Sequence, residues 1–189
     1  MIYLASQSPR RRELLDQIGV QYQCIPADID ESPLCGEKPQ DYVQRMAISK
    51  AEAIHQQHRN HPVLGSDTCV VLNNHILGKP ENRQDAIEML MQLSGHSHQV
   101  LTSVALVHRQ THYRLSSSEV LFRKIKRDEA ERYWLTGEPV DKAGGYAIQG
   151  YAAVFVASIQ GSYSGIMGLP LYETAQLLEL IEESVWTEV

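Results

Sequence analysis

Apolar and polar residues alternate along this chain with two different periods, and each period predicts its own kind of element. Alternation, or short runs of β-forming residues, predicts strands at 2–5, 20–25, 62–72, 75–78, 100–107, 114–125 and 152–159. Apolar residues spaced three and four apart predict helices at 9–18, 39–58, 83–94, between Asp128 and Gly137, and from Pro170 onward, with a flexible loop at 161–168. The antiparallel pattern of the second half favours a mixed α/β (α+β) fold with an elongated mixed sheet rather than a doubly wound Rossmann sheet. We predict a single domain over residues 1–189.

The first predicted helix carries an unusual charge. Ser8 and Pro9 are typical of a helix start, and three arginines at 10–12 follow in the first turn and a half. Cations there oppose the helix dipole, at a cost of roughly 0.3–1 kcal/mol each. Free amides and arginines together favour a site for a polyanion, most simply phosphate. Helical spacing places Arg11 on the buried stripe, whereas Arg12 faces solvent.

Two further charged residues fall where the pattern predicts burial. Lys50 lies within the apolar stripe of the helix predicted at 39–58, so it either snorkels to the edge or meets an anion. Asp67 interrupts the strand predicted at 62–72, where a carboxylate is costly unless it is paired, hydrogen-bonded or bound to metal. A turn cap is the plainer explanation of Asp67. The neighbouring Gly65 favours a site, because it lets another group approach the backbone closely.

Other segments contain candidate functional residues that also have a purely structural interpretation. The acidic loop at 27–31 could hold a divalent cation or simply be solvated. Lys79 could reach a phosphate or stay exposed. The glycine-rich stretch at 141–150 lets backbone approach a ligand, and its Gln149 offers the donor and acceptor that base recognition needs. The two histidines at 96–98 are predicted at the surface, although a metal pair would also suit them.

Composition limits the class of protein. The 189 residues are 43% hydrophobic and can bury a full core, while no apolar run approaches the roughly 20 residues of a membrane span. A formal net charge of −6 argues against a general nucleic-acid binder, so any anion site is local. The first residues lack a secretory-signal pattern, and three cysteines without paired spacing fit reduced thiols. We expect a cytoplasmic protein with no nucleic-acid or membrane partner.

Common nucleotide and hydrolase motifs are absent from the sequence. It has no phosphate loop ending in Gly-Lys-Ser or Gly-Lys-Thr, no Gly-x-Gly-x-x-Gly after a strand and no Gly-x-Ser-x-Gly elbow. What remains is a scattered set of cations and carboxylates: Arg10, Arg11, Lys50, Lys79, Glu31 and Asp67. That set suits a polyphosphate bound through side chains and a divalent metal, with attack of water on phosphorus.

Six stretches spread over nearly the whole chain form a series. They are Leu4-Ala5-Ser6-Gln7-Ser8-Pro9-Arg10-Arg11, Gly65-Ser66-Asp67-Thr68, Leu77-Gly78-Lys79-Pro80, Leu93-Ser94-Gly95, residues 141–150, and Gly168-Leu169-Pro170-Leu171. In content and order this series resembles the Maf family of nucleoside triphosphate pyrophosphatases. Ser66, where the family leads us to expect Ala, and Gly145, where Ala is common, are small departures that remove no functional group.

The resemblance implies a Maf/ITPase-like fold with two lobes around a nucleotide cleft, assembled as a homodimer. It implies hydrolysis of nucleoside triphosphates to the monophosphate and pyrophosphate, with Mg²⁺ or Mn²⁺. Asp67 matches the catalytic position, and Glu31 with Asp67 matches the metal positions. The phosphate-binding positions are matched by Ser6, Ser8, Arg10, Lys50 and Lys79. The positions that set base choice are matched by Arg11, Thr68 and Gln149.

The second arginine and the glutamine of these motifs indicate a branch of the family. Members acting on dTTP and UTP look like this chain, whereas members preferring 7-methyl-GTP tend to lack the arginine at Arg11 and carry Glu in place of Gln149. A neutral amide matches the alternating carbonyl and N–H edge of thymine or uracil, and a carboxylate prefers donor-rich guanine. We therefore predict a dTTP/UTP pyrophosphatase that keeps the nucleotide pool clean, with modified pyrimidine nucleotides as further candidates. A nucleotide-binding regulator of cell division and septum formation without essential catalysis, or a phosphatase releasing single phosphates, stays open.

Overall fold

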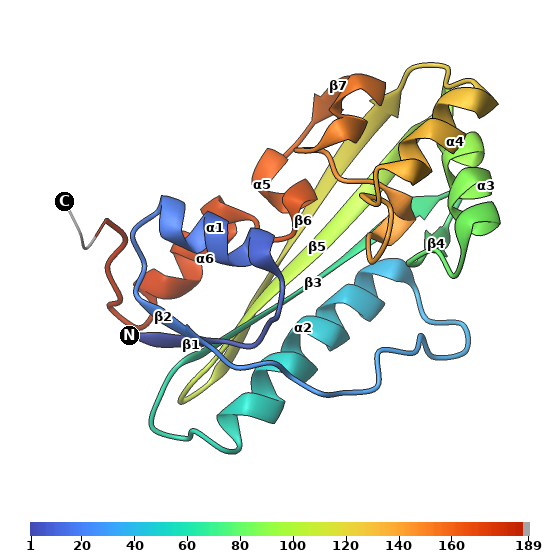
Figure 1. Cartoon of the computed structure of the whole chain (residues 1–189). Coiled ribbons are helices and arrows are strands. Elements are labelled where there is room, and N and C mark those ends of the chain that lie inside the picture. The colour runs from blue at the N-terminus through green and yellow to red at the C-terminus, as the bar shows by residue number, and fades with distance from the viewer. Residues whose placement is uncertain (187–189) are drawn as a thin grey trace.

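A mixed sheet organises the structure, with helices on both of its faces (Figure 1). The computed structural model describes residues 1–186. Within them, seven strands form the sheet: β1 (Ile2–Leu4), β2 (Tyr22–Cys24), β3 (Val63–Leu72), β4 (His75–Leu77), β5 (Ser97–Val107), β6 (Thr111–Phe122) and β7 (Val156–Gln160). The helices of the same residues are α1 (Pro9–Gln17), α2 (Pro39–His55), α3 (Arg83–Leu93), α4 (Arg127–Leu135), α5 (Tyr163–Met167) and α6 (Leu171–Glu179), with short 3₁₀ helices η1 (Ala143–Gly145) and η2 (Tyr151–Phe155). The predicted fold class is confirmed.

The edge of β3 is shared by two short strands that leave a gap between them. The strand order is β2-β1-β3-β5-β6-β7, and β4 also pairs with β3. On the side away from β5, β1 runs parallel to Val63 and Leu64, and β4 runs antiparallel to residues 70–72. Within the described part of the chain, no strand pairs with residues 65–69 on that side. The middle of β3 therefore has an open edge, and Asp67 lies on it.

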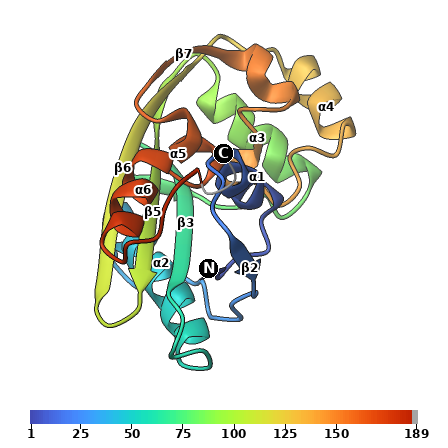
Figure 2. The same ribbon diagram turned by 90° about the vertical axis from the view of Figure 1, so that its left-hand side faces the viewer.

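The two faces of the sheet are covered by different helices (Figures 1 and 2). On one face, α2 packs against β3 and β5. It approaches so closely that a Cβ at Gly65 would overlap the Ala47 carbonyl oxygen, which explains why glycine occupies this position. On the other face, Leu64 of β3 packs with Leu14 and Leu15 of α1 and with leucines of α6. Side chains alternate along a strand, so Asp67 faces α2 while Thr68 faces the opposite helices.

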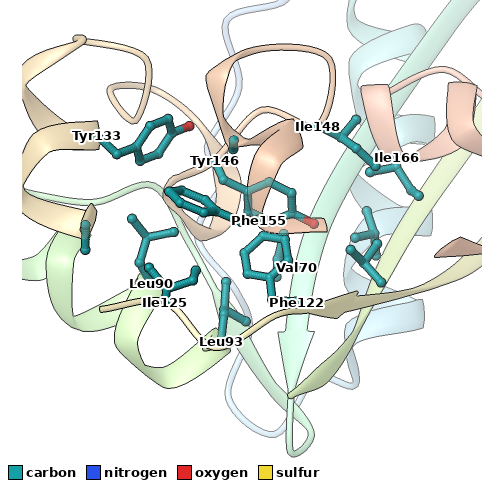
Figure 3. Close-up of a cluster of buried hydrophobic side chains, with 14 of the residues drawn as sticks. Val70, Leu90, Leu93, Phe122, Ile125, Tyr133, Tyr146, Ile148, Phe155 and Ile166 are labelled. Carbon is teal, nitrogen blue, oxygen red and sulfur yellow. The ribbon is translucent and has the colours of Figure 1, made fainter. Parts of the chain in front are cut away.

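A second hydrophobic core lies on the same face of the sheet as α1 and α6, and we call it the far lobe. Side chains of α3, α4, η2 and the irregular segment after α4 pack on the ends of β3, β5 and β6 (Figure 3). Aromatic rings hold its centre: the Phe122 ring lies 4.9 Å from that of Tyr146, and the Tyr133 ring lies 5.4 Å from that of Phe155. Two lobes therefore stand side by side on the sheet, one built on α1 and α6 and one on α3 and α4.

Most elements match the sequence-based expectation. Two segments that differ from it both lie after residue 150. The strand predicted at 152–159 is wrong in its first half, where residues 151–155 form η2, because the Glu138 carboxylate accepts hydrogen bonds from the first backbone N–H groups of this turn. The flexible loop predicted at 161–168 is also wrong. It contains α5, which Ser162 caps by accepting a hydrogen bond from the Gly165 N–H and which Gly168 ends at a φ of 119°.

Two predictions about single residues are corrected. Asp128 does not cap α4: the N-cap is Lys126, whose backbone N–H donates to Glu129. The surface prediction for the two histidines holds for His96, which is exposed, and is wrong for His98, which is buried with its Nε2 2.8 Å from the Tyr146 hydroxyl. None of the helices in residues 1–186 is long and apolar enough to cross a membrane.

Candidate active site

A pocket of about 1000 Å³ opens at the gap in the β3 edge, between the two lobes. Its walls come from the loop between β1 and α1, from α2, from β3, from the segment after β4, from residues 141–149 and from α5. All ten site residues predicted from the sequence line it: Ser6, Ser8, Arg10, Arg11, Glu31, Lys50, Asp67, Thr68, Lys79 and Gln149. The fold thus brings together residues that lie far apart in the sequence.

Three charged groups form the centre of the pocket. The Lys50 ammonium lies 2.7 Å from Asp67 Oδ1 and 2.9 Å from Glu31 Oε1. Lys50 therefore meets anions rather than snorkelling to the helix edge, because α2 directs it at the open part of β3. Asp67 is 6% exposed, and burial raises its pKa, although Lys50 and Arg11 act in the opposite direction.

The donors at this centre suit a hard divalent cation that also binds the substrate. Glu31 and Asp67 offer carboxylate oxygens that share one lysine. Asp28 and Asp30 of the acidic loop do not line the pocket, and Asp30 accepts a hydrogen bond from the Ser32 N–H. In residues 1–186, no group of three or more His, Cys, Asp or Glu side chains could hold a metal ion alone. Mg²⁺ commonly binds through one or two carboxylates together with substrate phosphates, which fits this pair.

The first turn of α1 brings the arginines to the pocket. Arg11 donates from Nε to the Gly168 carbonyl at 2.8 Å and from Nη1 to the Ser6 hydroxyl at 3.1 Å. The Ser8 N–H also donates to the Ser6 hydroxyl. Burial lowers the pKa of Arg11, while the Asp67 carboxylate opposes this shift. Arg12 is exposed, as its place on the helix predicts, and does not line the pocket.

The opposite end of the pocket is largely apolar. Its floor is formed by Val70, Val100, Tyr146, Ile148 and Ile166. Two polar side chains border it. Gln149 is exposed, and Thr68 lies 3.0 Å from the Thr102 hydroxyl, which donates to the Gly165 carbonyl at 2.7 Å. An apolar slot with a few fixed polar groups is typical of a site for a base or another flat ring.

Two pocket residues were missed by the sequence analysis. Lys142 lines the pocket, and burial and then the nearby Arg10 lower its pKa. A lysine inside an already suspected glycine-rich stretch was the signal that could have found it. Tyr42 of α2 donates from its hydroxyl to the Glu31 carbonyl at 3.0 Å and so holds the acidic loop at the pocket. Its position on the same helical face as Lys50 was the corresponding signal.

Comparison with known proteins finds a family and relatives that match nearly the whole chain. The sequence model of one family, described as "Maf-like protein", matches residues 1–181. The dTTP/UTP pyrophosphatase of Alkalilimnicola ehrlichii is 56% identical over 187 residues, covering 96% of this chain and 93% of that protein. The dTTP/UTP pyrophosphatase of Saccharophagus degradans is 52% identical over 190 residues, covering 98% and 90%. Among solved structures, a HAM1 protein from Coxiella burnetii matches with a TM-score of 0.47 and 19% identity, covering 64% of this chain and 72% of that one.

Proposed function

Because this chain belongs to the Maf family, we propose that it is a nucleoside triphosphate pyrophosphatase that hydrolyses dTTP and UTP to the monophosphate and pyrophosphate. Relatives more than 50% identical over nearly their whole length carry this name. The observation that carries the proposal is the composition of one pocket. A buried carboxylate, Asp67, touches Lys50 at its charged end, and Gln149 borders its apolar end.

The reaction is the attack of water on the α-phosphorus. A new P–O bond forms to the water oxygen, and the bond from the α-phosphorus to the bridging oxygen of the β-phosphate breaks, so pyrophosphate leaves. Asp67 serves this attack through its carboxylate, as acceptor of the proton from water or as an oxygen ligand for a metal ion. Burial raises the pKa of Asp67 and moves it toward the range that suits a general base.

The cations of the pocket bind the triphosphate. Arg10, Lys50 and Lys79 neutralise its charge, and the small hydroxyls of Ser6 and Ser8 leave room for phosphate oxygens at the start of α1. Glu31 and Asp67 would hold Mg²⁺ or Mn²⁺ together with the phosphates, as their shared contact with Lys50 supports. When bound, the ion supplies charge neutralisation at the phosphate oxygens.

Base choice belongs to Arg11, Thr68 and Gln149, which line the same pocket as the apolar floor. The amide of Gln149 pairs with the alternating acceptor and donor edge of thymine or uracil. Arg11 keeps donors for the nucleotide, because its contacts to Gly168 and Ser6 use Nε and Nη1. This arrangement supports pyrimidine triphosphates over purines.

A cytoplasmic location and a homodimer are also part of the proposal. All three cysteines of the chain are free thiols, which supports a reducing compartment: Cys24, Cys35 and Cys69. The homodimer rests on the family resemblance, and light scattering of the purified protein tests it directly.

Product analysis tests the reaction. The protein is incubated with dTTP, UTP, CTP, ATP and GTP, with Mg²⁺, with Mn²⁺ or with a chelator, and pyrophosphate and phosphate are measured separately. We expect pyrophosphate from dTTP and UTP, and none with the chelator. Release of single phosphates would indicate a phosphatase, and tight binding without turnover would indicate a regulator.

A further inference from the structure

The backbone around Gln149 is held by two side chains that lie outside the pocket. Glu138 follows α4 and Tyr133 belongs to it, and the Tyr133 hydroxyl donates to Glu138 Oε1 at 2.7 Å. The Ala147 N–H donates to the Tyr133 hydroxyl at 3.3 Å. Beyond Gln149, the Tyr151 N–H donates to Glu138 Oε2 at 2.7 Å. We call Glu138 and Tyr133 the clamp, because they bind the chain on both sides of Gln149.

The clamp uses both oxygens of one carboxylate. Glu138 Oε1 also accepts from the Ala152 N–H at 3.1 Å, so this carboxylate accepts three hydrogen bonds, two of them from backbone. Hydrogen bonds to a charged acceptor are about twice as strong as neutral ones. A Cβ at Gly150 would overlap Glu138 Oε2. The residue directly after Gln149 is therefore a glycine because the carboxylate lies against the backbone there.

Packing fixes the same segment from below. Tyr146 and Ile148 are both buried in the core of the far lobe, and Figure 3 shows Ile148 beside Ile166. The Tyr146 hydroxyl also lies 2.8 Å from His98 Nε2. Gln149, by contrast, is exposed and lines the pocket. The segment thus has anchored neighbours and one outward side chain.

We propose that Glu138 and Tyr133 are positioning residues that hold Gln149 in place and thereby determine base specificity. The proposal rests on the proposed function, in which Gln149 reads the base. An amide discriminates between base edges only when its donor and acceptor are held in register, and pre-organisation removes the entropic cost of ordering it at binding. Neither clamp residue lines the pocket, so both act through the backbone on either side of Gln149.

Electrostatics offers a competing account that the variants can separate. The Glu138 carboxylate raises the pKa of Arg10 against the effect of burial, so its loss could weaken phosphate binding instead. Glu138→Gln removes the charge and replaces one of the two accepting oxygens by an NH2 group, which cannot accept a backbone hydrogen bond. Tyr133→Phe leaves the charge of Glu138 in place and removes the hydroxyl, and with it the hydrogen bonds to Glu138 and from Ala147, while the ring can still pack on Phe155. An effect through Arg10 would appear only in Glu138→Gln and would be equal for all triphosphates.

The experiment measures kcat/KM for dTTP and for GTP, in the wild type and in a Gln149→Ala background. We expect the ratio of dTTP to GTP to fall roughly tenfold in Glu138→Gln, the effect of losing one strong hydrogen bond, and roughly threefold in Tyr133→Phe. In the Gln149→Ala background both clamp changes should leave the ratio unchanged. Glu129→Gln is the matched control, because this carboxylate pairs with Arg123 away from the pocket, and it should keep the wild-type ratio.

The outcomes distinguish the clamp from the base-reading assignment. If Gln149→Ala itself keeps the wild-type ratio, the role of Gln149 fails, and the clamp proposal fails with it. If Gln149→Ala lowers the ratio but both clamp variants keep it, only the clamp is overturned. Equal losses for dTTP and GTP, or equal losses with and without Gln149, would likewise overturn it. Circular dichroism and thermal melting verify that each variant is folded, and Tyr133→Phe decides the question if Glu138→Gln does not fold.

Discussion

The charged end and the base end of the pocket are built in different ways. At the charged end, Lys50 projects from a long helix and Asp67 from the middle of β3, which pairs with β5, and an ion pair joins the two side chains. At the base end, Gln149 lies on irregular backbone, and a carboxylate outside the pocket together with the core holds it. Regular elements place side chains by their own hydrogen bonds. Irregular backbone needs a dedicated partner, and Glu138 is that partner here.

The two ends also differ in how one buried titratable group at each end makes stability depend on pH. Burial raises the pKa of Asp67 at the charged end and lowers that of His98, beneath the base end, to about 4. A raised carboxyl pKa gives stability that is lost as pH rises through it, so at neutral pH ionised Asp67 costs stability. A lowered histidine pKa gives stability that is complete above the unfolded value and lost as pH falls. At neutral pH, Asp67 therefore lowers the stability of the charged end, where its carboxylate is needed for the reaction. His98, in contrast, contributes its full stability near neutral pH.

The largest expected effect follows the substitution Asp67→Asn. Turnover of dTTP should fall by about 10³-fold, within the range of roughly 10²–10⁴ for loss of a general acid–base group. In metal-free buffer at pH 7 the melting temperature should change little, because the buried Asp67 charge and its ion pair with Lys50 are removed together, and Lys50 keeps its contact with Glu31. Asp30→Asn, in the exposed part of the acidic loop, serves as the control and should keep full activity. Retained turnover in Asp67→Asn would contradict the catalytic role of the charged end.

The next largest expected effect is a pH dependence of stability that comes from His98, beneath the base end. Between pH 7 and pH 5 the wild type should lose about 2 kcal/mol of unfolding free energy through His98, since each pKa unit is worth about 1.36 kcal/mol. His98→Gln should lack this part of the pH dependence. Denaturant unfolding at both pH values measures the difference, and exposed His96→Gln is the matched control. If His98→Gln loses as much unfolding free energy between pH 7 and pH 5 as the wild type, His98 is not the group that titrates.

These two ends were not equally predictable from the sequence. Lys50 and Asp67 stood out because a charge breaks a regular apolar pattern, and Arg11 because a cation stands at a helix start. Gln149 was recognised only with a glycine-rich stretch and a family resemblance. Glu138 carries no local signal, since its partners are backbone N–H groups beyond residue 146 and the tyrosine of a helix. The same contacts turned the first half of the strand predicted at 152–159 into η2, because periodicity does not report which backbone groups a distant carboxylate will bind.

An intermediate effect should appear at the base edge itself. Gln149→Glu should lower kcat/KM for dTTP roughly thirtyfold, about 2 kcal/mol, because a carboxylate faces the carbonyl oxygens of thymine. Turnover of GTP should fall less, so the ratio of the two measures the change. Gln160→Glu, exposed at the end of β7, adds the same charge away from the pocket and should leave the ratio as it is. Identical changes for every base would remove Gln149 from base recognition.

The smallest effect is expected at Ser66, where the two ends meet. Its buried hydroxyl lies 2.9 Å from both the Ser103 and Gly168 carbonyl oxygens, and Arg11 donates to the same Gly168 carbonyl at 2.8 Å. Ser66→Ala should therefore cost about 1 kcal/mol of unfolding free energy, the usual worth of one hydrogen bond. Arg11 still satisfies the Gly168 carbonyl, so kcat/KM for dTTP should stay within about twofold, a change below 0.5 kcal/mol. A larger loss confined to kcat/KM, with unchanged stability, would mean that Ser66 orients Arg11 and that the charged end controls the base end.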